Sequence, residues 1–371
     1  MKFCKKCILP STRPNLKFDS TGVCSACINF EDRGKIEWEE RARHFSSVAQ
    51  WARKNSRGFD CVIPVSGGKD STWQTIICLE HGLKPLCVSW KNPARTEIGR
   101  KNLENLISLG VDHIDYQVNP EIEKIFLRKS LMRFGATAIP MHMAMFNIPR
   151  TIAENFGIPL IVWGENSGFE YGDASDQSRG FELTDVWLEK YGVTNGTTAA
   201  DWIDEELDRR SMTPYFGPEG GRAREMNPRA VFLGYYFEWD PVKTFDIASE
   251  NGFTATISDR RTGYYFFADL DDRFISIHHY MKWLKFGFPR SFDNLSIEIR
   301  HGRLTRSKAI TIAKELGDGY PELDIESFAC FINKPVVWVQ AEMEKFRNPH
   351  IWKRDDSGYH IPGFLIPDWI W

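Results

Sequence analysis

The chain has 371 residues, 42% of them hydrophobic and 26% charged, which suffices for roughly two or three domains with sizeable cores. Its net charge of −3 disfavours a function that depends on a broad nucleic-acid-binding face, because such a face needs a basic surface. No apolar run approaches the roughly 18 residues of a membrane-spanning helix, and the amino terminus has no apolar signal segment. We therefore expect a cytoplasmic protein.

Four cysteines near the amino terminus form two close pairs, Cys4-x-x-Cys7 and Cys24-x-x-Cys27. The spacing within and between the pairs is typical of a zinc site with four thiolate ligands. Disulfides are the alternative, which a reducing cytosol disfavours. Because four thiolates fill a tetrahedral shell, we expect structural zinc and not catalytic zinc. We assign residues 1–45 to this zinc ribbon and its connector, with a helical stretch over 31–55.

Residues 46–255 alternate short apolar segments with longer helical ones. This alternation predicts an α/β fold with a doubly wound, mostly parallel five-stranded sheet. The predicted strands are 61–65, 86–90, 113–118, 159–163 and 231–237. The predicted helices are 72–81, 95–109, 121–134, 141–156 and 241–251. An insertion at about 167–228, with one helix near 199–210, interrupts the pattern and is interpreted as a substrate lid or substrate-side wall.

One motif stands where the first strand ends and the first helix of the sheet begins: Ser66-Gly67-Gly68-Lys69-Asp70-Ser71. A glycine turn into a helix start presents backbone N–H groups and the positive end of the helix dipole, which suits a pyrophosphate. Lys69 adds a positive charge, and the two serines add hydroxyl donors. Asp70 would repel a bare phosphate, so it is best explained as a ligand of Mg²⁺ carried by a nucleotide.

The motif differs from two common nucleotide-binding patterns. It lacks the first glycine of the mononucleotide-binding loop, since position 63 is Ile, and Asp70 replaces the Ser or Thr that follows the lysine. The dinucleotide-binding pattern fails as well. It does resemble the Ser-Gly-Gly-x-Asp-Ser loop of the ATP pyrophosphatases, which cleave ATP between the α and β phosphates. A solvated glycine turn is the alternative.

Two more segments lie where strands of the predicted sheet end, and ligands of such sheets bind at those ends. By similarity to the ATP pyrophosphatases, Ser89 and Trp90 would face adenine. Gly164 and Glu165 follow the fourth strand, and Glu165 would hold Mg²⁺ or orient the substrate. A role as turn or helix-cap residues is the alternative for this last pair.

Cations gather in the carboxy-terminal region. Lys282 and Lys285 are three positions apart and would share a helix face, and Arg290 follows the end of that helix. Cations placed over a triphosphate would stabilise the departing pyrophosphate. We therefore predict catalytic roles for Lys285 and Arg290, alongside Lys69 and Asp70. A solvated basic face is the alternative.

Three sequence blocks together resemble the N-acetyl sugar amidotransferase family: CILPSTRPNLKFDSTGVCSAC, PVSGGKDST and HYMKWLKFGFPRS. The resemblance covers nearly the whole chain, from Cys4 to at least Arg306. Members of this family build acetamidino sugars for bacterial O-antigen, other surface polysaccharides and flagellin glycans. The resemblance implies an adenine nucleotide alpha hydrolase-like sheet, and a carboxy-terminal region, 256–371, that completes the active site and offers a possible partner interface.

The family chemistry implies ATP and Mg²⁺ as cofactors and an acetamido sugar, nucleotide-linked, as substrate. The amide oxygen would take AMP from ATP, and ammonia would then displace the AMP to leave an acetamidine. Ser66, Gly67 and Gly68 would cradle the pyrophosphate, which Lys69 would neutralise. We find no glutaminase module in the sequence. The resemblance therefore implies separate glutaminase and ammonia-channel subunits, similar to the two-subunit imidazole-glycerol-phosphate synthase, and we expect no nucleic-acid or membrane partner.

Two other functions remain open at this point. A tRNA-modifying ATP pyrophosphatase of the thiolation or lysidine type shares the adenylation step, but it should have a basic tRNA-binding face. The acidic balance of the chain and the lack of a third Cys-x-x-Cys pair count against it. A zinc-ribbon adaptor with an inactive nucleotide fold is the other, and the intact motif at 66–71 counts against that.

Overall fold

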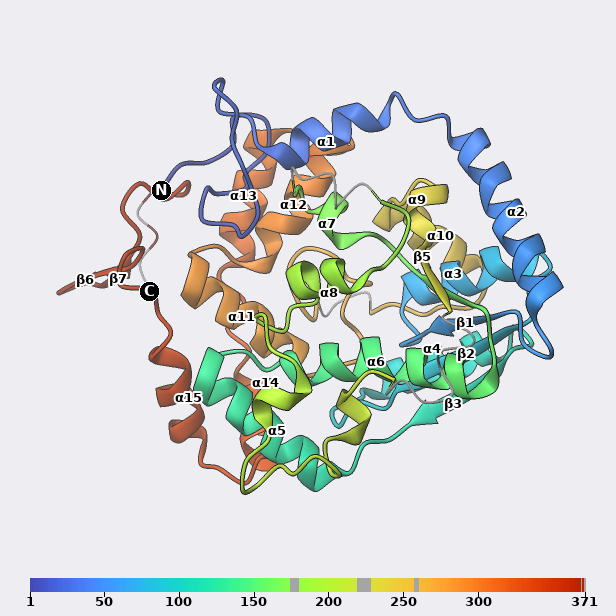
Figure 1. The fold of residues 1–371 in the computed structure, drawn as a ribbon. Helices are drawn as coiled ribbons and strands as arrows, with labels where there is room; N and C mark the ends of the chain where they lie inside the picture. The colour runs from blue at the N-terminus through green and yellow to red at the C-terminus, as the bar shows by residue number, and fades with distance from the viewer. Residues whose placement is uncertain (174–179, 219–227, 257–259, 368, 370–371) are drawn as a thin grey trace.

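The structure is a computed structural model that describes residues 1–173, 180–218, 228–256, 260–367 and 369. Its centre is a five-stranded sheet in the order β3-β2-β1-β4-β5, in which every neighbouring pair is parallel (Figure 1). The strands are β1 (Cys61–Pro64), β2 (Pro85–Trp90), β3 (Asp112–Tyr116), β4 (Leu160–Trp163) and β5 (Arg229–Phe232). The predicted doubly wound parallel sheet is thus confirmed. The strand order reverses between β1 and β4, where such sheets bind ligands.

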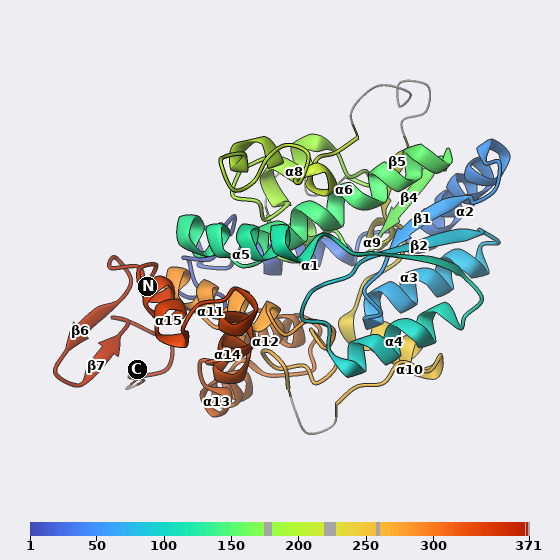
Figure 2. The same cartoon turned by 90° about the horizontal axis from the view of Figure 1, so that it is seen from below.

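Helices cover both faces of the sheet, as Figure 2 shows. The helices on one side are α3 (Lys69–Glu80) and α4 (Glu97–Ile107), with α10 (Pro241–Glu250) packed on α3. On the other side, α6 (Ile139–Phe156) contacts three strands, and α5 (Pro120–Phe134) packs on α6. The side chains of β1 alternate accordingly: Val62 belongs to the core under α6, whereas Cys61 and Ile63 belong to the core under α3. Burial on both faces explains the continuous apolar runs of the strands.

The amino-terminal segment docks on the carboxy-terminal region and not on the sheet alone. Ile8 is fully buried against Phe288 and Phe292, and Arg306 Nε donates a 3.0 Å hydrogen bond to the carbonyl of Cys7. The predicted helical stretch 31–55 is two helices, α1 (Ser25–Arg33) and α2 (Trp38–Asn55). They are separated at the exposed Gly34, where the helix-destabilising freedom of glycine favours a break.

The carboxy-terminal region is mainly helical, as predicted, and packs around an apolar core that it shares with Leu127 and Leu131 of α5. Its helices are α11 (Ile275–Phe286), α12 (Arg290–Arg300), α13 (Arg306–Leu316), α14 (Glu322–Phe331) and α15 (Val336–Glu344). A small antiparallel hairpin, β6 (Lys353–Asp355) and β7 (Gly358–His360), follows them. None of the helices in the described ranges combines the length and apolarity needed to cross a lipid bilayer.

Two predicted elements are wrong in part. The predicted strand 231–237 stops early because residues after Phe232 turn into the short helix α9 (Leu233–Tyr236), where the N–H of Gly234 donates to the carbonyl of Gly164. The predicted helix 199–210 is only a 3₁₀ turn, η2 (Ala199–Trp202). It ends because the carboxylate of Asp204 accepts backbone N–H groups two and three residues ahead, which closes a turn.

The rest of the insertion contains short elements. They are α7 (Ser167–Glu170), α8 (Asp185–Tyr191) and the 3₁₀ turn η3 (Thr213–Tyr215). Trp187 and Tyr215, from the last two of these, pack into the core under α6. The insertion thus extends that core, and its segments 174–179 and 219–227 lie outside the described residues.

Candidate active site

The glycine motif forms the turn from β1 into α3. Gly67 has φ +85°, and a Cβ atom there would lie 2.6 Å from the backbone nitrogen of Leu103, so only glycine fits. Gly68 is the extended residue that precedes α3, and within the described part of the chain no side chain caps that helix end. The N–H groups of the first turn of α3, with the helix dipole, are therefore available to an anion.

Lys69 and Asp70 form a salt bridge at this turn. The ammonium of Lys69 lies 2.6 Å from both carboxylate oxygens of Asp70 and 3.2 Å from the hydroxyl of Thr244. Asp70 Oδ1 also accepts hydrogen bonds from the indole N–H of Trp239, at 2.9 Å, and from Thr244, at 3.1 Å. Lys69 is only 5% exposed. Because water screens a buried charge weakly, its ammonium interacts strongly with Asp70 and with any anion that binds at this turn.

A cavity of about 210 Å³, called the site cavity below, opens beside the motif. All six motif residues line it, together with Glu165 from the end of β4. Burial, and next the charge of Asp70, raise the pKa of Glu165 to about 7. Two neighbouring carboxylates of this kind are hard oxygen ligands that could hold a divalent cation such as Mg²⁺.

The opposite wall of the site cavity comes from the carboxy-terminal region. It includes Asp269, Asp271 and Arg290. Arg290 is partly buried, with its guanidinium 3.4 Å from the hydroxyl of Tyr171 and 3.7 Å from a carboxylate oxygen of Asp293. Burial raises the pKa of Asp271 to about 6. The wall therefore brings one fixed cation and two carboxylates to the glycine motif.

Close backbone contact holds this wall against the sheet domain. The N–H of Thr96 donates to the carbonyl of Asp271 at 3.1 Å, and the side chain of Asn92 donates to the same carbonyl at 3.2 Å. A Cβ atom at Gly99 would lie 2.5 Å from the Cα of Asp271. Gly99 thus permits the segment around Asp271 to lie directly over the start of α4.

The structure brings together most, but not all, of the predicted site residues. The six residues of the motif, Glu165 and Arg290 share the site cavity. Among the described residues, Ser89, Trp90, Gly164 and Lys285 lie outside its lining. The hydroxyl of Ser89 donates to Asp115 at 2.7 Å, Trp90 packs against the core under α6, and the carbonyl of Gly164 accepts from Gly234.

The predicted placement of Lys282 and Lys285 over a triphosphate needs correction. The ammonium of Lys282 contacts the carboxylate of Asp293, and that of Lys285 contacts the carbonyl of Phe134, the last residue of α5. A cation at the carboxyl end of a helix is favoured by the helix dipole. Burial lowers the pKa of each lysine to about 8. Lys285 therefore serves the packing of α11 on α5 and lies outside the lining of the site cavity.

Several residues of the cavity were not identified from the sequence. They include Tyr171, Trp239, Asp269 and Asp271. The acidic run Asp269-Leu270-Asp271-Asp272 was a usable signal, because such a run beside a predicted nucleotide site suggests cation ligands. For Trp239, the sequence offered a single clue, which is its position directly before Asp240, the residue that caps α10.

The four amino-terminal cysteines converge as predicted. Their ligand atoms all lie within 4.8 Å of one another, and all four residues are buried. The sulfur atoms of Cys7 and Cys24 are 3.6 Å apart, and those of Cys4 and Cys27 are 3.9 Å apart. Tetrahedral coordination with Zn–S bonds of about 2.3 Å requires sulfur separations of this size. The four cysteines therefore fit a metal ion held by thiolates.

Comparison with known protein families gives a match in the carboxy-terminal region. Residues 259–363 match the family described as LPS biosynthesis protein WbpG-like, C-terminal domain. This range supplies Asp269, Asp271 and Arg290 to the site cavity. The match supports the resemblance to the sugar amidotransferases. Comparison with curated protein sequences gives no match.

Two solved structures show distant similarity to this chain. An NMN synthetase from Francisella tularensis is 11% identical, with a TM-score of 0.32, and 72% of this chain and 94% of that chain are covered. An NAD+ synthetase from Burkholderia pseudomallei is 11% identical, with a TM-score of 0.27, and the covered shares are 58% and 87%. At such low TM-scores, the fold assignment rests on the strand order of this chain itself.

Proposed function

We propose that this chain is an ATP-dependent sugar amidotransferase, because its residues 259–363 match the family of WbpG-like LPS biosynthesis proteins. It converts the acetamido group of a sugar to an acetamidino group and forms AMP and pyrophosphate. The product serves the synthesis of a bacterial surface polysaccharide, such as O-antigen, or of a flagellin glycan. The substrate is an acetamido sugar carried on a nucleotide.

One observation carries this proposal. The glycine motif of the sheet domain and the WbpG-like region line the same cavity, with Lys69 and Asp70 on one wall and Asp271 and Arg290 on the other. A pyrophosphate-binding turn would serve any ATP pyrophosphatase. The second wall belongs to the region that matches a family of LPS biosynthesis proteins. This shared cavity supports a function in which ATP cleavage is coupled to the modification of a sugar.

The reaction needs activation because an amide is a poor electrophile. The amide oxygen attacks the α-phosphorus of ATP, the bond to the β-phosphate breaks, and pyrophosphate leaves. Ammonia then adds to the activated carbon, the C–O bond to AMP breaks, and the amidine forms with release of one proton. No side-chain nucleophile takes part, so the enzyme contributes positioning and electrostatic stabilisation.

Residues of the site cavity fit these tasks. The first turn of α3 binds the pyrophosphate, and Lys69 transfers its hydrogen bonds from Asp70 to a phosphate oxygen. Asp70 and Glu165 are then free to hold Mg²⁺, which would neutralise phosphate charge when bound. Arg290 stabilises negative charge from the opposite wall.

Two further assignments complete the proposal. The four-cysteine cluster binds zinc, which fixes the ribbon on α12 and α13 and plays no chemical part, because its ligand shell is closed. Ammonia comes from a separate glutaminase, since free ammonia is scarce beside ammonium at neutral pH.

Product analysis tests the proposal directly. The enzyme is incubated with ATP, Mg²⁺, ammonium chloride and UDP-linked diacetamido sugars, and the products are examined by mass spectrometry. We expect AMP, pyrophosphate and a sugar in which one oxygen atom is replaced by an NH group. Asp70→Asn should abolish the change while the protein stays folded. Release of ADP in place of AMP would contradict the proposal.

A further inference from the structure

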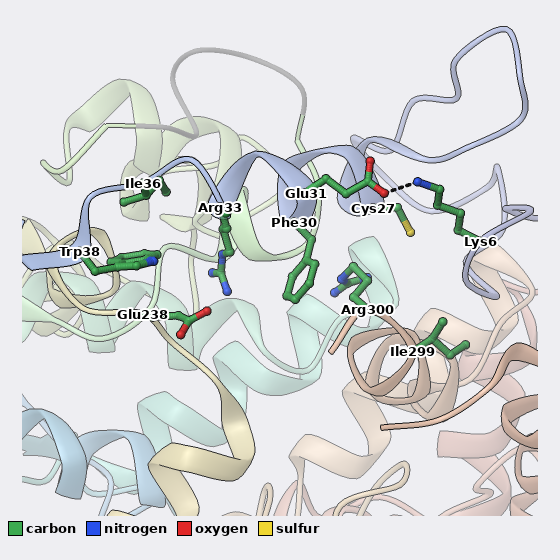
Figure 3. Close-up of a pocket in the computed structure, with 11 residues that line it drawn as sticks. Lys6, Cys27, Phe30, Glu31, Arg33, Ile36, Trp38, Glu238, Ile299 and Arg300 are labelled. Carbon is green, nitrogen blue, oxygen red and sulfur yellow. Dashed lines mark hydrogen bonds and ion pairs between the residues drawn. The ribbon is translucent and has the colours of Figure 1, made fainter. Parts of the chain in front are cut away.

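A second cavity lies between the zinc ribbon and α12, away from the glycine motif. It has a volume of about 590 Å³, and we call it the outer cavity. Figure 3 shows Phe30 and Arg33 pointing into it from α1, towards Glu238 and Arg300. Ile36 and Trp38, from the connector between α1 and α2 and the start of α2, close its other end.

A small hollow lies between the outer cavity and the site cavity. It shares Phe30, Arg33 and Arg300 with the outer cavity. It shares Trp239 and Ile297 with the site cavity. The three spaces therefore adjoin one another, and the side chains that line two of them form the partitions between them. The partition nearest the glycine motif includes Trp239, whose indole N–H donates to the carboxylate of Asp70.

The size of the hollow limits what can pass. Its volume is about 10 Å³, which corresponds to about one water-sized molecule. A nucleotide or a sugar is far too large for it. Ammonia has the size of water, and it is the one small reactant that the proposed reaction needs besides ATP and the sugar.

A buried ion pair stands in the hollow. The guanidinium of Arg33 contacts the carboxylate of Glu170, and both side chains are less than a tenth exposed. Arg33 also donates a 3.0 Å hydrogen bond to the carbonyl of Trp239. Burial raises the pKa of Glu170 to about 7, and the neighbouring charge of Arg33 opposes that rise. A fixed charge pair also obstructs the passage of other ions.

We propose that the outer cavity is the entrance for ammonia, which reaches the site cavity through the hollow beside Arg33 and Glu170. The inference rests on the proposed function. It adds a route by which ammonia enters the site cavity separately from ATP and the sugar. It also implies that the subunit supplying ammonia docks over the ribbon side of the chain.

A bulky substitution in the outer cavity tests the route. Ile36→Trp enlarges a side chain that lines the outer cavity and lies outside the lining of the site cavity. The matched control is Lys35→Trp, because Lys35 is the neighbouring residue, its side chain is 79% exposed and it lies outside the cavity lining. Thermal unfolding of both variants checks that they fold like the wild type.

Two half-reactions separate the outcomes. Exchange of labelled pyrophosphate into ATP, in the presence of a UDP-linked diacetamido sugar and without ammonium, reports adenylylation alone. Product formation with ammonium chloride reports ammonia capture. We expect Ile36→Trp to keep the exchange but to lower kcat/KM for ammonium by roughly tenfold or more, since positioning of a reactant contributes this much. Lys35→Trp should match the wild type in both assays.

Three results would overturn the inference. The route is wrong if Ile36→Trp uses ammonium as well as the wild type does. It is also wrong if a folded Ile36→Trp loses the exchange, because the cavity would then serve ATP or sugar. Absence of exchange in the wild type with every acetamido sugar would remove the proposed function itself, and the ammonia route with it.

Discussion

The indole nitrogen of Trp239 lies 2.9 Å from Oδ1 of Asp70, and this hydrogen bond joins the end of the sheet domain to the glycine motif. Trp239 is nearly fully buried and contributes to the core under α3, so its indole is fixed in place. The same oxygen of Asp70 accepts from Thr244 in α10. Two neutral donors thus orient Asp70 Oδ1 when Lys69 turns to a phosphate.

Replacing Trp239 by Phe should weaken catalysis more than it weakens the fold. The ring still fills the core, but one hydrogen bond to a charged group is lost, worth about 1.5–3 kcal/mol. We expect kcat/KM for ATP to fall by roughly 10- to 100-fold, in line with that energy. Pyrophosphate release measured at several ATP concentrations provides the value.

Trp51→Phe is the matched control for this change. Trp51 packs on the same core from α2 and is remote from the site cavity. It should lose a comparable amount of apolar contact and keep full activity. Equal losses of activity in the two variants would show that Trp239 acts through packing and not through its hydrogen bond to Asp70.

Arg290 and Lys285 should differ sharply when each is neutralised. Arg290 faces the site cavity, so Arg290→Met should lower kcat by roughly 100-fold or more, as loss of one oriented donor to developing charge does. Lys285 contacts the carbonyl of Phe134, so Lys285→Met should lower stability slightly and leave kcat unchanged. Steady-state kinetics with thermal unfolding separate the two effects. A large loss of kcat in Lys285→Met alone would reverse the assignment.

The sheet and the glycine motif were predictable because their signals are local. Each strand is a short apolar run, since both faces of a parallel sheet are buried. The motif at 66–71 requires a backbone turn with a positive φ at Gly67. Glycine adopts this conformation readily, so its presence in the sequence predicts the turn. The strand ends were less accurate: β5 gives way to α9 at Leu233, where packing of Gly234 on the backbone of Glu165 overrides the strand pattern.

The far wall of the site could not be predicted in detail because it depends on docking between distant segments. Asp271 reaches the motif only because Gly99 permits close contact with α4. Lys285 seemed a suitable cation from its charge alone, and its orientation depends on how α11 packs on α5. Periodicity places a residue on a helix face but does not say which neighbour that face meets.

The two glycines of the motif should fail in different ways when changed to alanine. Gly67→Ala forces a Cβ to within 2.6 Å of Leu103 at φ +85°. We expect it to lower the free energy of unfolding by more than the roughly 1–2 kcal/mol that a left-handed alanine costs. Gly68→Ala, at φ −71°, should fold normally but lose ATP binding, because the added methyl group would lie 3.2 Å from Ser66 Oγ, in the turn proposed to bind the pyrophosphate.

Urea unfolding and calorimetric ATP titration distinguish these effects. Gly110→Ala is the control for backbone strain, because Gly110 has φ +94° with no atom within 4 Å of an added Cβ. It should show the strain cost alone. Tight ATP binding by Gly68→Ala would rule out the motif as the pyrophosphate site.

Loss of one cysteine ligand should release the metal and loosen the ribbon. Cys24→Ser removes a thiolate from the cluster, and structural zinc contributes an apparent folding energy of about 10–16 kcal/mol in small zinc domains. The ribbon would then expose Ile8, which is buried against Phe288 and Phe292. We expect less than one metal ion per chain by elemental analysis and a lower Tm.

The control for this change is Cys330→Ser, since Cys330 is exposed and distant from the cluster. It should keep the metal content and the Tm of the wild type. A Cys24→Ser protein that retains one tightly bound metal ion per chain would show that the four cysteines do not act as one ligand set.

Glu123, in the middle of the fold, should make stability depend on pH. It is 2% exposed, and burial raises its pKa from 4.5 to about 8. Between these values the unfolded chain loses the proton that the folded chain keeps, so the free energy of unfolding falls as pH rises and then levels above about pH 8. Glu123→Gln mimics the protonated form and should remove this fall. Urea unfolding from acid to alkaline pH should therefore show the variant increasingly more stable than the wild type, whereas Glu121→Gln, whose side chain is 71% exposed, should show a constant difference. A constant difference for Glu123→Gln as well would mean that folding does not raise the pKa of Glu123.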